Sequence, residues 1–141
     1  NYGPRQYIEK FVPKVITYSM LGKKIPVYGD GLNKREWIHV SDNCRAIDLV
    51  MQYGEAGEIY NIGSQFEMTN VQLATEITKK IDTNIEITFV EDRKGHDFRY
   101  SLDSSKIKSM GFVERIDFET GLSDTIEWYK SNLDFWKPID L

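Results

Sequence analysis

The sequence predicts an α/β fold, specifically a small mixed α/β domain, and two observations carry this prediction. Apolar residues recur at intervals of three and four in some segments, as on one face of a helix, and alternate with polar residues in others, as in strands. The 141 residues are 40% hydrophobic and 28% charged, a globular composition at the length of one domain. No internal repeat or linker is visible, so residues 1–141 are expected to form one unit.

Proline and glycine delimit the first elements. A helix is expected to begin near Phe11, because Pro13 is tolerated only in a first helical turn, and Gly22 is a suitable end cap. The segment Ile25–Tyr28 predicts a short strand, which the glycine turn Gly29–Gly31 closes.

Two strands and a helix are expected in the middle of the chain. Glu36–Val40 and Glu58–Gly63 have the aromatic and β-branched character of strands. Between them, Ser41 is a fair N-cap for a helix that ends at Gly54 or Gly57. Four residues of this helix are expected to face inward: Cys44, Ile47, Val50 and Met51.

The remaining elements are predicted by caps and periodicity. Thr69 and Gln72 form a capping-box pattern ahead of a helix that buries Leu73, Ala74, Ile77 and Ile81. Ile85–Phe89 alternates as a half-buried strand does, and the charged segment Glu91–Tyr100 predicts a loop. Asp103 caps a short helix that reaches Met110, and a last helix carries one apolar stripe: Phe118, Leu122, Ile126 and Tyr129.

Charge and cysteine content exclude several classes of protein. Eighteen Lys and Arg against 22 Asp and Glu give a net charge of −4, which argues against a nucleic-acid-binding protein. The lone Cys44 excludes an internal disulfide and suits a reducing compartment. No apolar run approaches the ~20 residues that span a bilayer. We therefore expect a cytoplasmic protein with no nucleic-acid, membrane or metal partner.

The residues themselves show no machinery for hydride transfer. A dinucleotide-binding loop needs three spaced glycines, but Gly29 and Gly31 are followed by Lys34 where the third should fall. No tyrosine is followed four residues later by a lysine, the pair that short-chain dehydrogenases use. No catalytic and no cofactor-binding residue is therefore predicted within this chain.

Basic side chains indicate a small phosphorylated ligand as one possibility. Lys10, Arg35 and Arg93 interrupt apolar or aromatic segments, and their convergence would suit a diphosphate. Tyr28 offers a flat face to a base. His96 lies in a charged loop, where a surface role and a binding role are both open. Taken singly, each basic residue is more often a solvated surface charge, so spacing alone leaves both interpretations standing.

A series of short motifs follows the chain in a familiar order: Asn1-Tyr2-Gly3-Pro4, Ile8–Pro13, Pro26–Gly31, Arg35–Val40, Glu58–Gly63, Asp92–Asp97, Arg99–Asp103 and Thr125–Tyr129. Together they resemble the C-terminal part of the dTDP-glucose 4,6-dehydratases, which belong to the extended short-chain dehydrogenases/reductases. The Glu-Lys-Phe-Val-Pro and Arg-Lys-Gly-His-Asp segments are the most specific. Related epimerases and decarboxylases share Tyr-Gly-Pro and Val-Tyr-Gly-Asp-Gly.

The resemblance implies a lyase that converts dTDP-glucose or UDP-glucose to the 4-keto-6-deoxy sugar nucleotide with bound NAD. Such enzymes act in deoxysugar or rhamnose biosynthesis, and they are commonly homodimers. In that family a Rossmann domain precedes a smaller substrate domain. Residues 1–141 are then the nucleotide-sugar-binding domain, NAD binds upstream of Asn1, and the chain alone is inactive. The alternatives are a UDP-sugar decarboxylase or 4-epimerase, or a nucleotide-sugar-binding module without chemistry.

The resemblance also implies which residues bind the substrate. These are Asn1, Arg35 and Asn61 near the diphosphate, Lys10 and Phe11 at the head of the first helix, Pro26 and Tyr28 against the base, and Arg93 and His96 in the loop that closes over the nucleotide. Asn43 and Lys94 depart from the family pattern, which leaves the choice between thymidine and uridine open.

Overall fold

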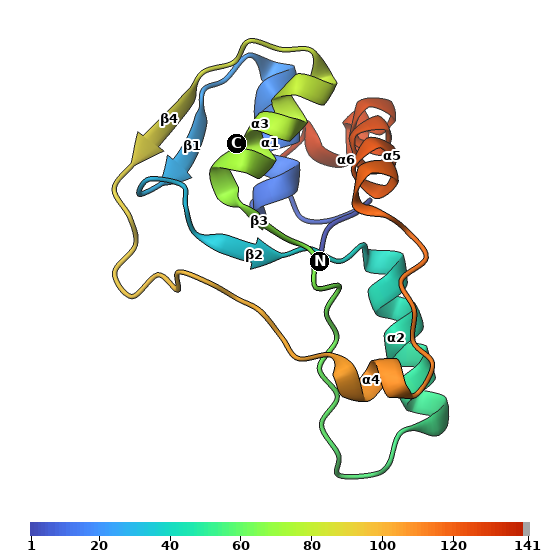
Figure 1. Cartoon of the computed structure of the whole chain (residues 1–141). Coiled ribbons are helices and arrows are strands. Elements are labelled where there is room, and N and C mark those ends of the chain that lie inside the picture. The colour runs from blue at the N-terminus through green and yellow to red at the C-terminus, as the bar shows by residue number, and fades with distance from the viewer. Residues whose placement is uncertain (140–141) are drawn as a thin grey trace.

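The structure, a computed structural model, describes residues 1–139, and its larger part consists of helices with a pair of strands on one side. α1 (Phe11–Leu21), α3 (Asn70–Ile81) and α5 (Phe118–Ser131) pack against one another (Figure 1). β1 (Ile25–Tyr28) pairs with β4 (Ile87–Val90), and β1 contacts both α1 and α3. This part contains most of the buried apolar side chains.

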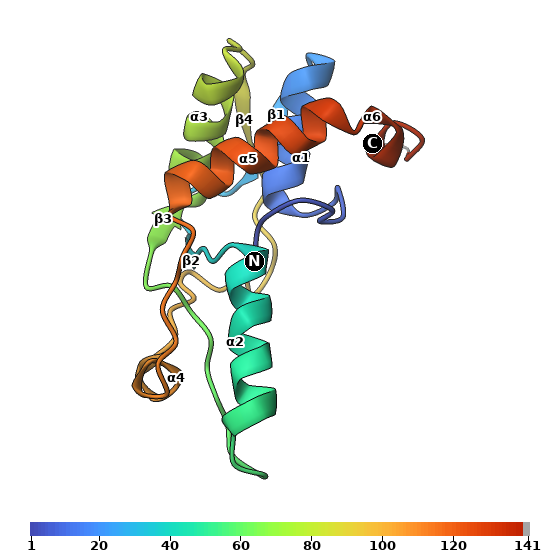
Figure 2. The ribbon, with the colours of Figure 1, turned by 90° about the vertical axis from the view of Figure 1, so that its right-hand side faces the viewer.

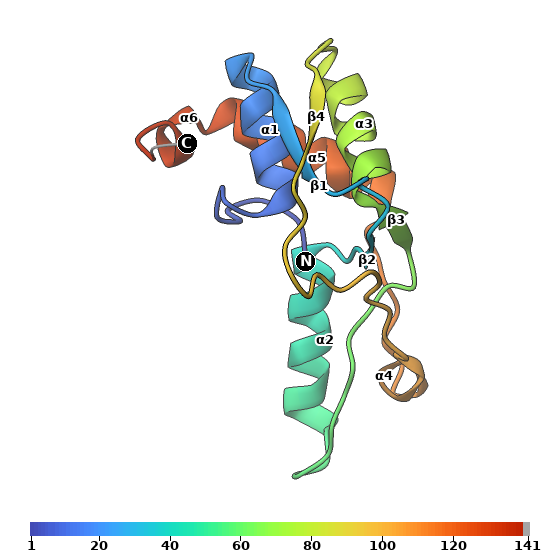
Figure 3. The same ribbon diagram turned by 90° about the vertical axis from the view of Figure 1, so that its left-hand side faces the viewer.

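An elongated second part extends from the first. α2 (Val40–Tyr53) points away from the body, and α4 (Ser105–Ser109) lies near its far half, as the side views show (Figures 2 and 3). β2 (Lys34–Glu36) and β3 (Glu67–Thr69) pair where the two parts meet. The short α6 (Leu133–Trp136) packs against α5.

Two groups of buried apolar residues stabilise these parts. The larger core includes Tyr2, Ile16, Leu73, Leu122 and Trp136. The smaller core joins α2 to α4 through Ile38, Ala46, Ile107 and Phe112. Full burial of an aliphatic side chain contributes about 1.5–3 kcal/mol relative to exposure, so the larger core dominates stability.

The parallel pairing of β1 and β4 determines where the next loop begins. Ile25 lies opposite Ile87, and Tyr28 lies opposite Val90, so both strands end at the same edge. The charged loop that follows Val90 therefore starts beside Tyr28. β2 and β3 run antiparallel, with Arg35 opposite Met68.

The first and third helices confirm their predictions. α1 begins at Phe11 and ends at Gly22, whose φ of 67° is the left-handed conformation of a C-cap. α3 has the complete capping box: the Thr69 hydroxyl accepts from the Gln72 N–H at 3.2 Å, and the Gln72 side chain accepts from the Thr69 N–H at 3.0 Å. The strand at Ile25–Tyr28 and the stripe of α5 are also as predicted.

Two expected strands are wrong. Glu58–Gly63 is extended but pairs with no strand among residues 1–139, and Ile59 in it is 79% exposed. A strand requires a ladder partner, which local sequence does not reveal. The strand expected over Glu36–Val40 is displaced, because β2 ends at Glu36, and beyond it only a single bridge joins His39 to Tyr2.

The expected inward face of α2 is also wrong. Val50 packs on the smaller core, but Cys44, Ile47 and Met51 are exposed. The buried stripe is instead Asp42, Ala46, Leu49 and Val50, which has the same helical spacing. The N-cap is His39 rather than Ser41, since the His39 Nδ1 accepts from the Ser41 N–H at 3.3 Å.

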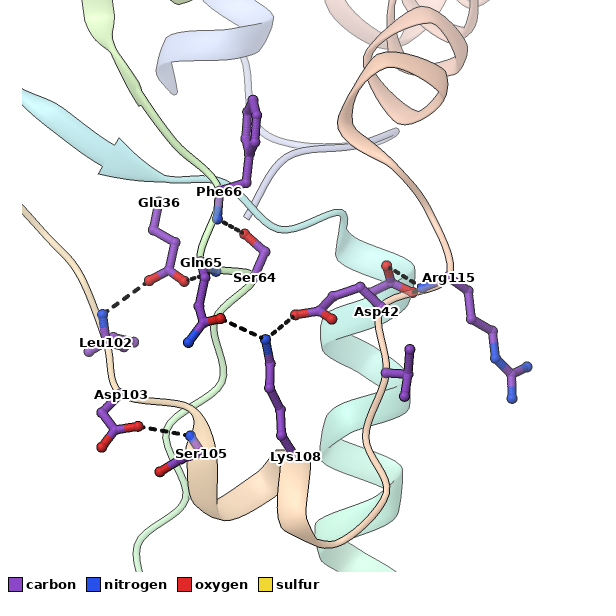
Figure 4. Close-up of polar contacts among 12 residues, drawn as sticks. Glu36, Asp42, Ser64, Gln65, Phe66, Leu102, Asp103, Ser105, Lys108 and Arg115 are labelled. Carbon is purple, nitrogen blue, oxygen red and sulfur yellow. Dashed lines mark hydrogen bonds and ion pairs between the residues drawn. The ribbon is translucent and has the colours of Figure 1, made fainter.

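Two carboxylates, the half-buried Glu36 and the buried Asp42, accept backbone N–H groups that connect the two parts (Figure 4). Glu36 accepts the backbone N–H of Gln65 and that of Leu102, the latter at 3.1 Å. A Cβ on Gly63 would lie 2.5 Å from a Glu36 oxygen, so only glycine allows this approach. Asp42 accepts the N–H groups of Arg115 and Ile116 and so ties α2 to the segment entering α5.

Candidate functional site

A cavity of about 460 Å³ opens between α1, β1, β2 and the loop after β4. Its size is within the range of small-molecule sites. Among the residues that line it are Asn1, Lys10, Phe11, Pro26, Tyr28, Arg35, Arg93 and His96. The structure thus brings together every residue predicted to bind substrate except Asn61.

Ordinary local structure directs these side chains toward the cavity. Lys10 is the N-cap residue of α1 and Phe11 its first residue, so both lie at the helix end that carries unsatisfied N–H groups. In β1, Ile25 and Val27 are buried in the core, which turns Pro26 and Tyr28 to the opposite face.

The Arg35 guanidinium is held by the loop that follows β4. One terminal nitrogen donates to the Lys34 carbonyl at 2.7 Å, and the other donates to the Asp97 carbonyl at 2.9 Å and lies 3.0 Å from His96 Nε2. Its flat face lies 4.4 Å from the Tyr100 ring centroid. These contacts keep Arg35 extended along the cavity wall.

The loop places two more groups over Tyr28. The Arg93 guanidinium lies 5.1 Å from the Tyr28 ring centroid, and the His96 ring meets the same tyrosine edge to face at 6.2 Å. His96 Nδ1 lies 2.6 Å from an Asp92 carboxylate oxygen. The hydrogen bond from His96 lowers the pKa of Asp92, so Asp92 is a carboxylate at neutral pH.

Positive charge dominates the cavity. Lys10, Lys14, Arg35 and Arg93 all line it. Within residues 1–139, the ammonium groups of Lys10 and Lys14 have no hydrogen bond or ion pair. Two acidic residues, Glu9 and Glu36, also border the cavity, and the Glu36 carboxylate accepts two backbone N–H groups. The cavity therefore suits an anionic ligand.

Asn70 is a lining residue that sequence reasoning missed. It is the first residue of α3 and only 9% exposed, yet its side-chain amide makes no hydrogen bond to any described residue. Because this amide lines the cavity and has no partner among the described residues, it is available to a ligand. Sequence reasoning missed Asn70 because it directly follows the Thr69 cap, where the start of a helix already accounts for a polar residue.

Asn61 lies elsewhere. Its amide donates to the Asp103 carbonyl at 3.3 Å, and it is not among the residues lining the cavity. Lys14 and Tyr100 are further lining residues outside the predicted set. Lys14 was discoverable, because it follows Lys10 by four residues on the same helix and so shares its face.

Trp37 separates this cavity from a second one of about 270 Å³, since it lines both. The second cavity is bordered by Tyr2, His39 and Asp42. The indole N–H of Trp37 is buried and makes no hydrogen bond within residues 1–139.

The turn at Gly29–Gly31 does not have the geometry of a dinucleotide-binding loop. Gly29 and Gly31 have positive φ angles of 58° and 73° and form a turn that leads from β1 into β2, not into a helix. A dinucleotide site needs a helix N-terminus at that point. Among residues 1–139 there is also no cluster of three potential metal-ligating side chains and no helix with the length and hydropathy to cross a membrane.

Several known proteins are similar to this chain over nearly its whole length. A curated dTDP-glucose 4,6-dehydratase of Streptomyces niveus is 50% identical over 141 residues, which are 99% of this chain and 42% of that protein. A dTDP-glucose 4,6-dehydratase of Streptomyces venezuelae, crystallised with NAD, superposes with a TM-score of 0.96 at 44% identity and covers 99% of this chain and 44% of its own. A Thermotoga maritima UDP-glucose 4-epimerase solved with UDP-glucose has a TM-score of 0.88 at 29% identity, with 94% and 44% covered.

The chain thus spans less than half the length of these relatives. It has the fold expected from the sequence, a small α/β structure that matches part of an extended short-chain dehydrogenase/reductase. The sequence model of the family described as GDP-mannose 4,6 dehydratase matches residues 1–125. The chain therefore belongs to the GDP-mannose 4,6 dehydratase family, and within it resembles the dTDP-glucose 4,6-dehydratases.

Proposed function

We propose that residues 1–141 are the nucleotide-sugar-binding part of an NDP-glucose 4,6-dehydratase that acts on dTDP-glucose or UDP-glucose. The observation that carries the proposal is the convergence of separate segments on one basic, tyrosine-walled cavity. The spacing of the basic residues in the sequence did not show whether their side chains meet in one place. The dehydratase relatives at 44–50% identity support the substrate class.

The arrangement suggests a role for each wall. Tyr28, with Pro26 behind it on β1, offers a face for the base, which stacking stabilises by about 1–3 kcal/mol in nucleic-acid complexes. Lys10 and Arg93 supply donors to the diphosphate, and Arg35 adds its charge from the wall. Asn70 supplies an amide, whereas the contact predicted for Asn61 would require its amide to leave the Asp103 carbonyl.

The whole enzyme is proposed to eliminate water from the glucose unit with NAD bound outside residues 1–141. The acid–base residues of the reaction are expected there too, so the chain by itself should be inactive. We further propose that the enzyme is a cytoplasmic homodimer; the exposed, unpaired Cys44 suits a reducing compartment. A 4-epimerase is less favoured, since the epimerase relative is only 29% identical.

Calorimetric titration of the 141-residue chain with dTDP, UDP and inorganic pyrophosphate tests the binding role. We expect weak binding of the nucleotides, because part of the site is supplied from outside the chain. Tyr28→Ala should weaken dTDP binding and leave pyrophosphate binding unchanged, whereas Lys10→Met should weaken both. Tyr53→Ala, an exposed tyrosine on α2 far from the cavity, is the matched control.

Two results would contradict the proposal. Wild-type affinity in the Lys10→Met and Tyr28→Ala variants would place nucleotide binding elsewhere. Turnover of dTDP-glucose by the isolated chain would show that the catalytic groups lie within residues 1–141.

A further inference from the structure

We propose that Asp92 is a positioning residue: it holds the His96 imidazole in the tautomer that accepts a hydrogen bond from Arg35. The effect on ligand affinity rests on the proposed function, while the tautomer itself follows from contacts within the chain.

The contact between Arg35 and His96 defines the protonation of one ring nitrogen. A guanidinium has only N–H donors, so His96 Nε2, 3.0 Å from an Arg35 terminal nitrogen, must carry a lone pair and accept. In a neutral imidazole the proton then resides on Nδ1. That nitrogen lies 2.6 Å from Asp92, and its N–H donates to the carboxylate.

Asp92 is itself fixed in place. The same carboxylate oxygen accepts the Arg93 backbone N–H at 2.8 Å. The other oxygen packs on Gly29, where a Cβ would lie 3.0 Å from it. The absence of a side chain at this position leaves room for the carboxylate. The His96 side chain is only 6% exposed, which limits competition from water for its nitrogens.

The second histidine supplies an internal reference. His39 Nδ1 accepts from the Ser41 N–H, so its proton resides on Nε2. The two histidines of the chain therefore hold opposite tautomers, because each has a different hydrogen-bond partner at Nδ1.

Loss of the Asp92 carboxylate removes the acceptor for Nδ1–H. The contact with Arg35 alone then favours a proton on Nδ1, so the tautomer with the proton on Nε2, which would face the Arg35 N–H, becomes accessible. Arg35 would lose one of the contacts that hold it along the cavity wall. Asp92 thus acts on the cavity through His96 and needs no contact with a ligand.

Nitrogen-15 correlation spectra of the imidazole rings test this in the 141-residue chain at about pH 8.5, where unperturbed histidines are neutral. We expect the Nδ1–H pattern for His96 and the Nε2–H pattern for His39. In Asp92→Ala, the Nε2–H form of His96 should appear beside the Nδ1–H form, while His39 stays as it is. Asp92→Asn, which keeps an acceptor oxygen, should restore the wild-type pattern.

Glu91→Ala is the matched control, since it removes the same charge from the neighbouring exposed position. A wild-type His96 in the Nε2–H form, or an unchanged tautomer in a folded Asp92→Ala variant, would overturn the proposal. The wild-type spectrum tests the tautomer of His96 even if Asp92→Ala fails to fold. The His39 signals report whether each variant is folded.

Titration with dTDP separates this inference from the proposed function. Asp92→Ala should weaken dTDP binding about fivefold in the wild-type background, the scale of one lost hydrogen bond, and have no effect when Arg35 is already alanine. Equal weakening in both backgrounds would show that Asp92 does not act through Arg35. Absence of dTDP binding in the wild type would count against the proposed function but leave the tautomer result standing.

Discussion

Asp42, a fully buried residue of α2, accepts the backbone N–H of Arg115 at 3.2 Å. The neighbouring Ile116 N–H donates to the same carboxylate at 3.1 Å, and Arg45 donates to it as well. Burial alone would raise the pKa of Asp42, but these hydrogen bonds outweigh burial and leave the pKa below its usual value. The carboxylate is thus bound as an anion by the segment that enters α5.

Replacement of this anion should lower stability in a pH-dependent way. A folded pKa below the unfolded value, about 3.9 for aspartate, contributes stability that is complete above pH 4 and disappears as pH falls through the folded pKa. We expect Asp42→Asn to lower the free energy of unfolding by about 2 kcal/mol at pH 7 and by much less near pH 3. Urea denaturation at both pH values measures this. The exposed Asp48→Asn on the same helix is the control, and an equal loss at both pH values would contradict the expectation.

Gly121→Ala should also destabilise the chain, although alanine favours helices. A Cβ at position 121 of α5 would lie 2.5 Å from the hydroxyl of the buried Tyr2 and 2.9 Å from Ile116. Overpacking of this kind costs about 1–3 kcal/mol, more than the ~1 kcal/mol gained from helix propensity. Thermal unfolding should therefore show a lower Tm. Asp124→Ala, exposed on the same helix, should change stability little, and a Gly121→Ala variant of unchanged Tm would refute the overpacking.

The capping box of α3 makes a separate contribution. Thr69→Ala removes the hydroxyl that accepts from the Gln72 N–H and should cost about 1 kcal/mol in unfolding free energy. Thr75→Ala is a matched change, because the Thr75 hydroxyl, exposed in the middle of the same helix, donates only to the Val71 carbonyl. Chemical denaturation of both variants should show a loss for Thr69 alone. Equal losses of unfolding free energy in the two variants would show that the loss does not come from the cap.

Asn70 and Asn61 form a natural pair for testing the cavity. Asn70 lines it with an unpartnered amide, whereas Asn61 bonds to the Asp103 carbonyl outside it. Asn70→Ala should weaken dTDP binding about fivefold to tenfold, the effect of roughly one hydrogen bond. Asn61→Ala should leave the affinity of the folded chain unchanged. Calorimetry on both variants distinguishes them, and the reverse result would restore the role first predicted for Asn61.

The fold was predictable where a single segment contains its own signal. Pro13 and Gly22 delimit α1, and the Thr69–Gln72 pair marks the start of α3, because caps act within one turn. The strand predicted over Glu58–Gly63 is absent, because strand formation depends on a partner elsewhere in the chain. On α2, two stripes have the same helical period, and only tertiary packing selects Ala46 over Ile47 for burial.

The site shows the same division. Motifs identified Tyr28, Arg93 and His96, but their meeting in one cavity depends on the parallel register of β1 and β4, which no local pattern reports. Asn70 was hidden because a helix start explains an asparagine without any ligand.

Trp37 lines both cavities, so its intrinsic fluorescence can report on the candidate site. Only three tryptophans are present, and Trp136 is buried against α5, away from the cavity. Fluorescence from the indole of Trp37 should respond when a molecule enters the candidate site, while emission from Trp136 stays constant. Trp37→Phe therefore separates the Trp37 signal from those of Trp128 and Trp136, so that occupancy can be followed without a label on protein or ligand.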